Sequence, residues 1–300
     1  MTALDLKPVA TLDDALPRPK GRPRHVKGTR PGWFVYACLG IVMLASVFPF
    51  YWSLLIGSGD SYTIRDPNMS WIPGGNFFAN AARVVNDPAV NFWIALWNSI
   101  VSSALIAASV VFFSTLAGWA FAKLKFRGSS WLLVFVIATM AVPTQLGVVP
   151  LYILFSDLGW TGQLGAIIVP ALVSAFGVFW MTQYLRQAVP DELIEAARVD
   201  GASSFRTFLT VGLPAARPAA AMLALFTFVS AWNNFFWPFI VLDRQNPTLP
   251  VALSLLQSNY FIDYSIVLAG VLLATIPLLI LFVFAGKQLV SGIMQGAVKG

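Results

Sequence analysis

Hydrophobic residues follow one another along this chain in long runs that contain no charged side chain. These uncharged runs cover 31–59, 88–122, 128–156, 158–185, 218–242 and 264–286. Each exceeds the roughly 20 residues that an α-helix needs to cross about 30 Å of hydrocarbon. A membrane β-barrel would instead alternate apolar and polar residues in segments of about 10 residues. The pattern therefore predicts an all-α polytopic membrane protein with six transmembrane helices, placed near 33–55, 93–119, 131–154, 164–185, 218–240 and 264–286.

Composition excludes most other classes of protein. Hydrophobic residues make up 58% of the 300 and charged residues only 11%, against about 25% charged in a soluble domain. An ordinary soluble enzyme or a disordered protein is therefore excluded. The single cysteine, Cys38, excludes a disulfide framework and a Cys-based zinc cluster, and the single histidine, His25, excludes a His-centred triad or a His-rich metal site.

Lysine and arginine predict the orientation in the membrane. Seven precede the first span, three follow the second, four lie in 186–217 and two follow the sixth, whereas Arg65, Arg83 and Arg244 fall on the opposite side. We therefore expect both termini to be cytoplasmic. The net charge of +6 then reflects topology and attraction to anionic lipid, and we expect no nucleic-acid partner.

The same reasoning divides the chain into three parts. We expect residues 1–32 to form a flexible basic cytoplasmic leader, 33–286 to form the six-helix transmembrane permease domain, and 287–300 to form a cytoplasmic C-terminal tail. The leader is not a secretory signal, because the first apolar run lies far from residue 1 and is long enough to span the membrane.

Two classes of function fit a bundle with an uncharged interior: a subunit of an ATP-driven transporter, and a standalone secondary carrier or channel for a neutral solute. Ion-coupled carriers usually keep Asp, Glu, His or Arg inside their spans, and none of the six predicted spans contains one of these residues. The chain also has no GxxxxGK[ST] phosphate loop, so any ATP and magnesium must be bound by another subunit.

The largest polar loop, 186–217, is predicted to contain two short helices. Pro190 and Asp191 are typical of a helix start, and Gly201 of a helix end, while Ser203 or Ser204 can cap the second helix. Leu193, Ala196 and Ala197 would form one face of the first helix. That face suits docking into a groove on a partner, although a loop resting on lipid headgroups fits the same residues.

The spacing within this loop resembles the EAA signature of ABC importer permeases. That signature is Glu-Ala-Ala, three residues, glycine, nine residues, isoleucine, any residue, leucine and proline. The matching residues are Glu195, Ala196, Ala197, Gly201, Val211, Leu213 and Pro214, with Val211 in place of isoleucine. The resemblance implies that this loop couples the permease to a cytoplasmic ATPase subunit. The coupling residues would be those seven together with Leu193 and Asp200.

The resemblance extends over nearly the whole chain after the leader, and it is closest to the second permease of carbohydrate importers of the maltose type. The similar segments are Asn98-Ser99, 117–123, 143–150, 231–234 and the closing 296–300. It implies a bacterial inner-membrane protein, itself without enzymatic activity or cofactor. Its partners would be a second homologous permease, two cytoplasmic ATPase subunits that bind ATP and magnesium, and an extracytoplasmic sugar-binding protein. The tail Gly296, Ala297, Val298, Lys299 and Gly300 would contact the ATPase subunits.

The resemblance implies a sugar or oligosaccharide as substrate, and the uncharged interior fits a neutral, polyhydroxylated one. Aromatic faces and side-chain amides are the groups that bind sugar CH surfaces and hydroxyls. The candidate pathway residues are Gln145, Tyr152, Trp232, Asn233, Asn234 and Trp237. Membrane Trp and Tyr also form interfacial belts, and Asn often bonds between helices, so packing roles remain an alternative. The outside segments 57–92 and 241–263 would receive the binding protein, by analogy with the family.

Overall fold

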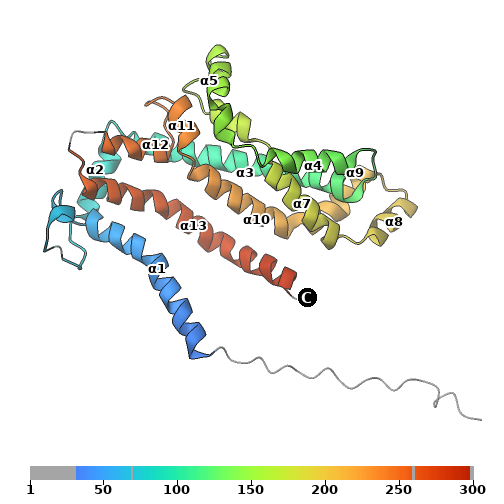
Figure 1. Ribbon diagram of the computed structural model, residues 1–300, viewed down its shortest axis with the longest axis horizontal. Helices are drawn as coiled ribbons and strands as arrows, with labels where there is room; N and C mark the ends of the chain where they lie inside the picture. Colours follow the sequence, from blue (N-terminus) through green and yellow to red (C-terminus); the bar gives the residue numbers. More distant parts are fainter. Residues whose placement is uncertain (1–31, 69, 259–260, 298–300) are drawn as a thin grey trace, which may run out of the picture. The chain divides into compact units, whose positions relative to one another are not determined.

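The computed structural model describes residues 32–68, 70–258 and 261–297, and gives the backbone alone for 287–297. The described residues form helices joined by turns and loops (Figure 1). The principal α-helices are α1 (Trp33–Gly57), α2 (Phe77–Asn86), α3 (Phe92–Lys123), α4 (Ser129–Thr139), α5 (Val148–Asp157), α6 (Gly165–Ile168), α7 (Ala175–Ala188), α8 (Asp191–Val199), α9 (Ser204–Thr207), α10 (Leu213–Trp232), α11 (Phe236–Val241), α12 (Leu249–Ser254) and α13 (Tyr264–Ala297).

The chain divides into two compact units between Val47 and Phe48. In the first unit, residues 33–47 form the initial turns of α1, and their largely apolar side chains are mostly exposed. A helix that is apolar on every side belongs in a membrane or in the core of a large protein. The second unit holds the remaining elements and the three clusters of buried hydrophobic residues.

The described part of the chain has five helical stretches long and apolar enough to span a membrane, or six if the bent pair α4–α5 is one span. The five are α1, α3, 165–188, 204–232 and the part of α13 up to Gly286. The all-α polytopic fold predicted from the uncharged runs is confirmed.

The third predicted span is not the continuous helix expected over 131–154. Its two halves, α4 and α5, are bent by 83° at a short break. Pro143 has no backbone N–H and disfavours a helical conformation at the residue before it, and a 3₁₀ turn, Thr144–Gly147, follows it. Apolar residues continue through the break, so hydropathy alone could not locate it.

Three other boundaries also differ from expectation. The fourth span is interrupted between α6 and α7, where a 3₁₀ turn contains Pro170 and the hydroxyl of Ser174 then caps α7. The fifth ends at Trp232 and is followed by the separate helix α11. The sixth continues through α13 to Ala297, so no helix boundary separates the predicted tail 287–300 from the predicted membrane domain.

Helix α3 packs along α7 and α10 and forms the centre of the second unit. Small residues allow this close approach, as is usual between membrane helices. A Cβ added at Gly118 would lie 2.6 Å from Cβ of Met181, and one at Gly177 would lie 2.3 Å from Oγ of Ser114. Both distances are too short for real carbon contacts, so these glycines are required where α3 and α7 meet.

The opposite end of α3 is attached to the segment that precedes α12. Nδ2 of Asn98 donates to the carbonyl of Pro247 (3.1 Å), and the backbone N–H of Leu249 donates to Oγ of Ser99 (2.7 Å). Both side chains are buried, so these bonds satisfy polar groups that lipid could not. The Asn-Ser pair singled out by the family resemblance therefore has a structural role.

Candidate functional site

Helix α8 is the first helix of the predicted coupling loop and begins where the sequence indicated. Pro190 occupies the N-cap position with an extended backbone, and Asp191 and Glu192 lie in the first turn. Carboxylates there complement the positive end of the helix dipole. Ile194 is buried in the core built by α3, α7 and α10, and it attaches one side of α8 to that core.

Gly201 ends α8 in the left-handed conformation, with φ +75°. The N–H of Ala202 donates to the carbonyl of Ala197 (2.9 Å), and the N–H of Gly201 donates to that of Arg198 (3.0 Å). This pair of bonds is the Schellman motif, in which glycine is preferred because it has no Cβ. A Cβ at Gly201 would meet nothing within 4 Å, so the requirement for glycine is conformational and does not come from crowding.

The second helix of the loop runs without interruption into the fifth span. Ser203 caps α9 by accepting from the N–H of Arg206 (3.3 Å). A π-helical turn, Phe208–Gly212 (η5), then joins α9 to α10. Pro214 has no N–H to offer the carbonyl of Thr210, which lies in that turn. Leu213 and Pro214, the last two residues of the family signature, are the first two residues of α10. The stretch 204–232 is long and apolar enough to span the membrane as one helix.

The π-helical turn lies against the end of α3. A Cβ at Gly212 would be 2.6 Å from Cε3 of Trp119, whose indole is buried and lies 5.9 Å from the ring of Phe208. Gly212 occupies the unspecified position of the family signature, so the motif did not identify it. The contact joins the loop to α3 through the indole ring of Trp119.

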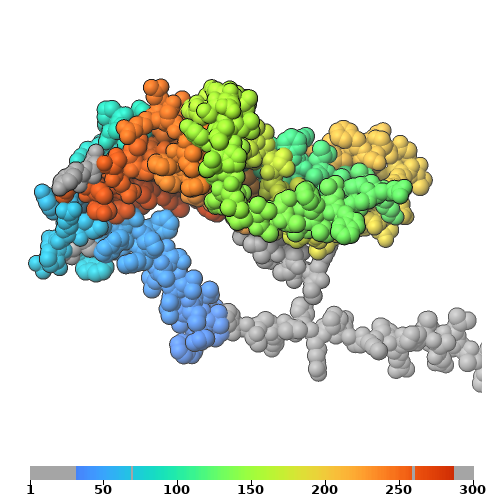
Figure 2. All heavy atoms as spheres, turned by 45° about the horizontal axis from the view of Figure 1, so that its top comes forward, coloured from blue at the N-terminus to red at the C-terminus, as the bar shows by residue number. Residues whose placement is uncertain are grey.

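The side of α8 away from Ile194 is exposed. Leu193 is 50% exposed and Val199 is 88% exposed, while Ala196 is exposed and Ala197 half-buried. In the space-filling view, the gold atoms of this loop lie at the right-hand end of the second unit (Figure 2). Leu193, Ala196 and Val199 therefore share an exposed side of α8, whereas Ala197, also expected on the docking face, is half-buried; Val199 was not among the predicted residues. The i, i+3 spacing of Val199 from Ala196 was the sequence signal that could have placed it on the same side of the helix.

Two further predicted coupling residues, Glu195 and Asp200, are exposed. The i, i+3 spacing of Glu195 and Arg198 would allow them to pair on the exposed side of α8. Within the described residues two ion pairs form, Arg83 with Asp263 and Lys123 with Asp191, so Glu195 and Arg198 do not pair.

The ion pair at the start of α8 was not predicted. Nζ of Lys123, the last residue of α3, lies 2.7 Å from Oδ1 of Asp191. The Lys123 side chain is 4% exposed, whereas that of Asp191 is 81% exposed. The hydrogen bond from Lys123, together with its charge, lowers the pKa of Asp191 below the ordinary value. The sequence identified Lys123 as one of the basic residues that predict orientation and as the last residue of the family-like segment 117–123, with no partner assigned to it.

The predicted pathway residues divide into an exposed group and a packed group. Gln145, Tyr152, Asn233 and Asn234 are exposed, although Nδ2 of Asn233 donates to the carbonyl of Val229 in its own helix (2.9 Å). Trp232 is 3% exposed and stacks on Phe228 at 5.8 Å. Trp237 is half-buried, and its Nε1 donates to the carbonyl of Ala166 (2.9 Å). The two tryptophans thus serve packing here.

The predicted C-terminal contact residues are only partly described. Gly296 and Ala297 end α13, and Val298, Lys299 and Gly300 lie outside the described residues.

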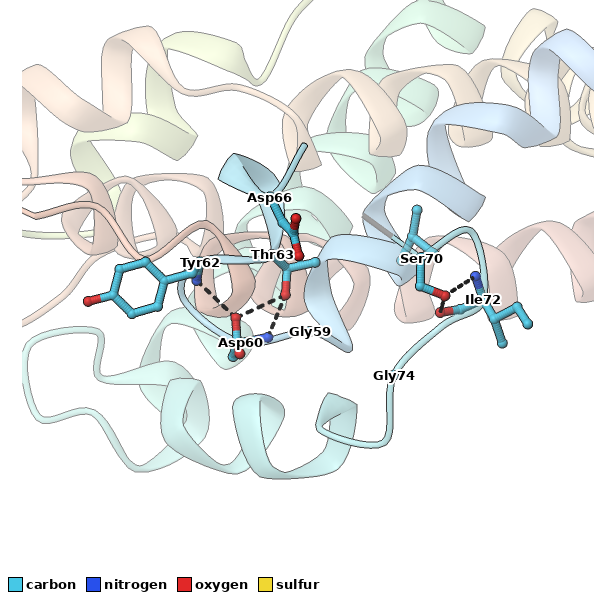
Figure 3. Close-up of a pocket in the computed structure, with 9 residues that line it drawn as sticks. Gly59, Asp60, Tyr62, Thr63, Asp66, Ser70, Ile72 and Gly74 are labelled. Atoms are coloured by element: carbon cyan, nitrogen blue, oxygen red, sulfur yellow. Dashed lines mark hydrogen bonds between the residues drawn. The ribbon is translucent and has the colours of Figure 1, made fainter. Parts of the chain in front are cut away.

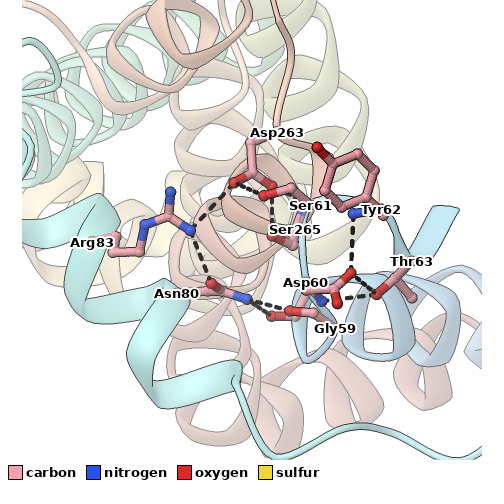
Figure 4. Close-up of polar contacts among 10 residues, drawn as sticks. Gly59, Asp60, Ser61, Tyr62, Thr63, Asn80, Arg83, Asp263 and Ser265 are labelled. Carbon is pink, nitrogen blue, oxygen red and sulfur yellow. Dashed lines mark hydrogen bonds and ion pairs between the residues drawn. The ribbon is translucent and has the colours of Figure 1, made fainter. Parts of the chain in front are cut away.

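A polar cluster lies at the end of the second unit occupied by α2 and the start of α13 (Figure 4). We call it the Asp263 cluster; its members are Ser61, Asn80, Arg83, Asp263 and Ser265. Asp263 accepts from Oγ of Ser61 (2.7 Å) and of Ser265 (2.6 Å), and it lies 3.2 Å from Nη1 of Arg83. Partial burial disfavours the ionised carboxylate. The bonds from Ser265 and Ser61 and the charge of Arg83 outweigh that and lower the pKa of Asp263.

A hollow of about 270 Å³ lies beside this cluster, in the loop that follows α1 (Figure 3). Its polar groups already bond within the loop. The carboxylate of Asp60 accepts from the N–H of Tyr62 (3.0 Å), and that of Asp66 from the N–H of Asn68 (2.8 Å). The hollow therefore has few free groups for a sugar.

Comparison with known proteins agrees with this geometry. The model of the family described as "Binding-protein-dependent transport system inner membrane component" matches residues 111–293. That match includes the whole coupling loop and four of the six predicted spans.

Two relatives match over most of the chain. The arabinooligosaccharides transport system permease protein AraQ of Halalkalibacterium halodurans is 34% identical over 70% of this chain and 75% of its own. AraQ of Bacillus subtilis is 32% identical over 87% of this chain and 93% of its own.

A solved bacterial ABC transporter involved in the import of the acidic polysaccharide alginate shares the fold. It has a TM-score of 0.71 at 23% identity and covers 89% of this chain and 99% of that chain. Together with the spaced loop signature and the helices that carry it, these matches show that the chain is a multi-pass membrane protein belonging to the family of binding-protein-dependent transport system inner membrane components.

Proposed function

We propose that this chain is one of two permease subunits of an ATP-driven importer for a carbohydrate. The observation that carries the proposal is the coupling loop. Its helix α8 exposes Leu193, Ala196 and Val199, and its second helix continues into a spanning helix through α10. An apolar helix face that the chain leaves uncovered suits a protein partner, and the continuous helix would carry movement of that partner into the membrane.

The partners would be a second permease, two cytoplasmic ATPase subunits and an extracytoplasmic sugar-binding protein. The ATPase subunits would bind ATP and magnesium and hydrolyse the nucleotide, with α8 docked in a groove on one of them. Gly296 to Gly300, at the end of α13 and beyond it, would form a second contact with the ATPases. In this proposal the protein would lie in a bacterial inner membrane, with both termini and the coupling loop in the cytoplasm.

The proposed substrate is a neutral sugar or oligosaccharide. Support comes from predicted spans without charge and from relatives named for arabinooligosaccharides. The exposed amides of Gln145, Asn233 and Asn234 and the exposed phenol of Tyr152 are the groups suited to sugar hydroxyls. Trp232 and Trp237 are left out of the proposed contacts, because packing already engages their rings.

The test uses the complete complex of both permeases, the ATPases and the binding protein in proteoliposomes. Uptake of a labelled oligosaccharide and ATP hydrolysis are measured together. Gly201→Ala should uncouple the two, because an alanine at φ +75° costs roughly 1–2 kcal/mol of backbone strain and would displace α8. Gly201→Asn is the matched control, since asparagine tolerates the left-handed conformation.

Gly201→Asp separates conformation from charge. It should uncouple less than Gly201→Ala if conformation is decisive, because aspartate also tolerates positive φ. Coupling that survives all three substitutions would contradict the proposed role of the loop. Absence of uptake driven by ATP and the binding protein in the unmodified complex would contradict the proposed function itself.

A further inference from the structure

The ion pair between Lys123 and Asp191 joins two helix ends of opposite polarity. Lys123 lies in the last turn of α3 and Asp191 in the first turn of α8. A cation at a helix C-terminus and an anion at a helix N-terminus each interact favourably with the helix dipole. The pair therefore connects the end of the second span to the start of the coupling helix at a distance of 2.7 Å.

The two partners have very different surroundings. The Lys123 side chain is almost entirely enclosed, at 4% exposed, while Asp191 is 81% exposed. An enclosed ammonium needs its counter-charge, whereas an exposed carboxylate can be hydrated by water. This asymmetry distinguishes the pair from ordinary surface salt bridges, which contribute little.

The helix end that carries Lys123 is also firmly packed. Gly118 of α3 lies against Met181 of α7, and Gly212 of the π-helical turn lies against Trp119 of α3. Neither glycine has room for a Cβ. Protein interiors packed this closely transmit displacements. A force applied to α8 through Asp191 would thus reach α3, α7 and the base of α10 together.

We infer that Lys123 is a positioning residue for energy coupling. It holds the start of α8 on α3 through Asp191, so the coupling loop drives two spans: α3 through the ion pair and α10 through the continuous helix. The inference rests on the proposed function and deepens it. If Lys123 served only as an orientation signal, the neighbouring exposed Lys125 would serve equally well, and removal of Asp191 would have no effect.

The test measures sugar molecules taken up per ATP hydrolysed by the reconstituted complex. Asp191→Asn leaves the Lys123 ammonium enclosed without a counter-charge, and we expect this ratio to fall about fivefold. Lys123→Met keeps most of the apolar stem and leaves only an exposed carboxylate, so a loss of about twofold is expected. Asp191→Glu retains the charge and should restore the ratio, and Lys125→Met should leave it unchanged.

The double variant Lys123→Met with Asp191→Asn should behave like Lys123→Met alone, because no enclosed ammonium remains. Hydrogen exchange of the α8 amides in the same complex reports attachment directly and should accelerate in Asp191→Asn but not in Asp191→Glu. Unchanged coupling and unchanged exchange in Asp191→Asn would overturn the inference. An equal loss in Asp191→Glu would also overturn it. A complex that already fails to couple without substitution would instead contradict the proposed function.

Discussion

The coupling loop, 186–217, and the Asp263 cluster lie at opposite ends of the second unit (Figure 1) and are held in place in different ways. At the Asp263 cluster, one carboxylate accepts from two hydroxyls and pairs with Arg83, and Asn80 donates to the carbonyls of Gly57 and Gly59. The first helix of the coupling loop has one ion pair and one buried apolar side chain, Ile194.

This difference in attachment indicates which end of the second unit is suited to move. A network whose polar groups are satisfied by several segments favours one arrangement. A helix attached at few points and exposing apolar side chains opens more easily and gains stability from a partner. We therefore expect the Asp263 cluster to stay fixed while the coupling loop follows whatever binds it.

The largest expected effect is a difference in stability between substitutions on the buried side and on the exposed side of α8. Ile194→Ala should lower the free energy of unfolding by about 2–5 kcal/mol, the usual cost of emptying a buried site. Val199→Ser, on the exposed side, should leave thermal unfolding unchanged and weaken ATPase binding in a pull-down. Equal thermal midpoints for both variants would contradict the described burial.

A smaller effect is expected where the loop meets α3. Gly212→Ala places a methyl group against the buried ring of Trp119, and overpacking of this kind costs about 1–3 kcal/mol. Gly75→Ala is the control, because a Cβ there would meet nothing within 4 Å. Thermal unfolding of the two variants in lipid nanodiscs measures the difference. If Gly212→Ala melts like the control, the close approach does not exist.

At the other end, Asp263→Asn should destabilise the fold by about 1–2 kcal/mol, because the charged hydrogen bonds from Ser61 and Ser265 are weakened. Asp157→Asn, an exposed carboxyl at the end of α5, serves as the control. Coupling between ATP hydrolysis and uptake should be unaffected in the variant that assembles. A loss of coupling without a loss of stability would show that the cluster moves during transport.

The smallest effect concerns pH. The pKa of Asp263 is lower in the folded protein than its ordinary value, which is about 3.9 in an unfolded chain. The carboxylate therefore stabilises the fold at every pH above that value, and the contribution disappears only as pH falls through the lower folded pKa. Thermal midpoints of the native protein and of Asp263→Asn should thus differ by the same amount at pH 7 and pH 5.

Much of the fold follows from local signals. Uncharged runs long enough to span predicted both ends of α1 and α3 to within a few residues, and the start of α13. They misplaced both ends of α10, which runs from Leu213 to Trp232 and not over 218–240, and they ended the sixth span before Ala297. Pro190, Gly201 and Ser203 predicted the limits of the short helices in the loop, because capping depends on the residue itself and its immediate neighbours. The Asn98-Ser99 pair was noticed only by resemblance, and its bonds to the segment before α12 required the structure.

The amino-acid sequence by itself determined that the chain spans a membrane and carries a spaced coupling signature. Hydropathy, helix-capping residues and motif spacing are all properties of neighbouring residues. Only the tertiary structure decided that the third span bends by 83°, that Trp232 is buried, and that Gly212 meets Trp119. It also decided that Lys123 pairs with Asp191 across 68 positions. The physical reason is the same in each case: burial and pairing depend on which surfaces the folded helices bring together.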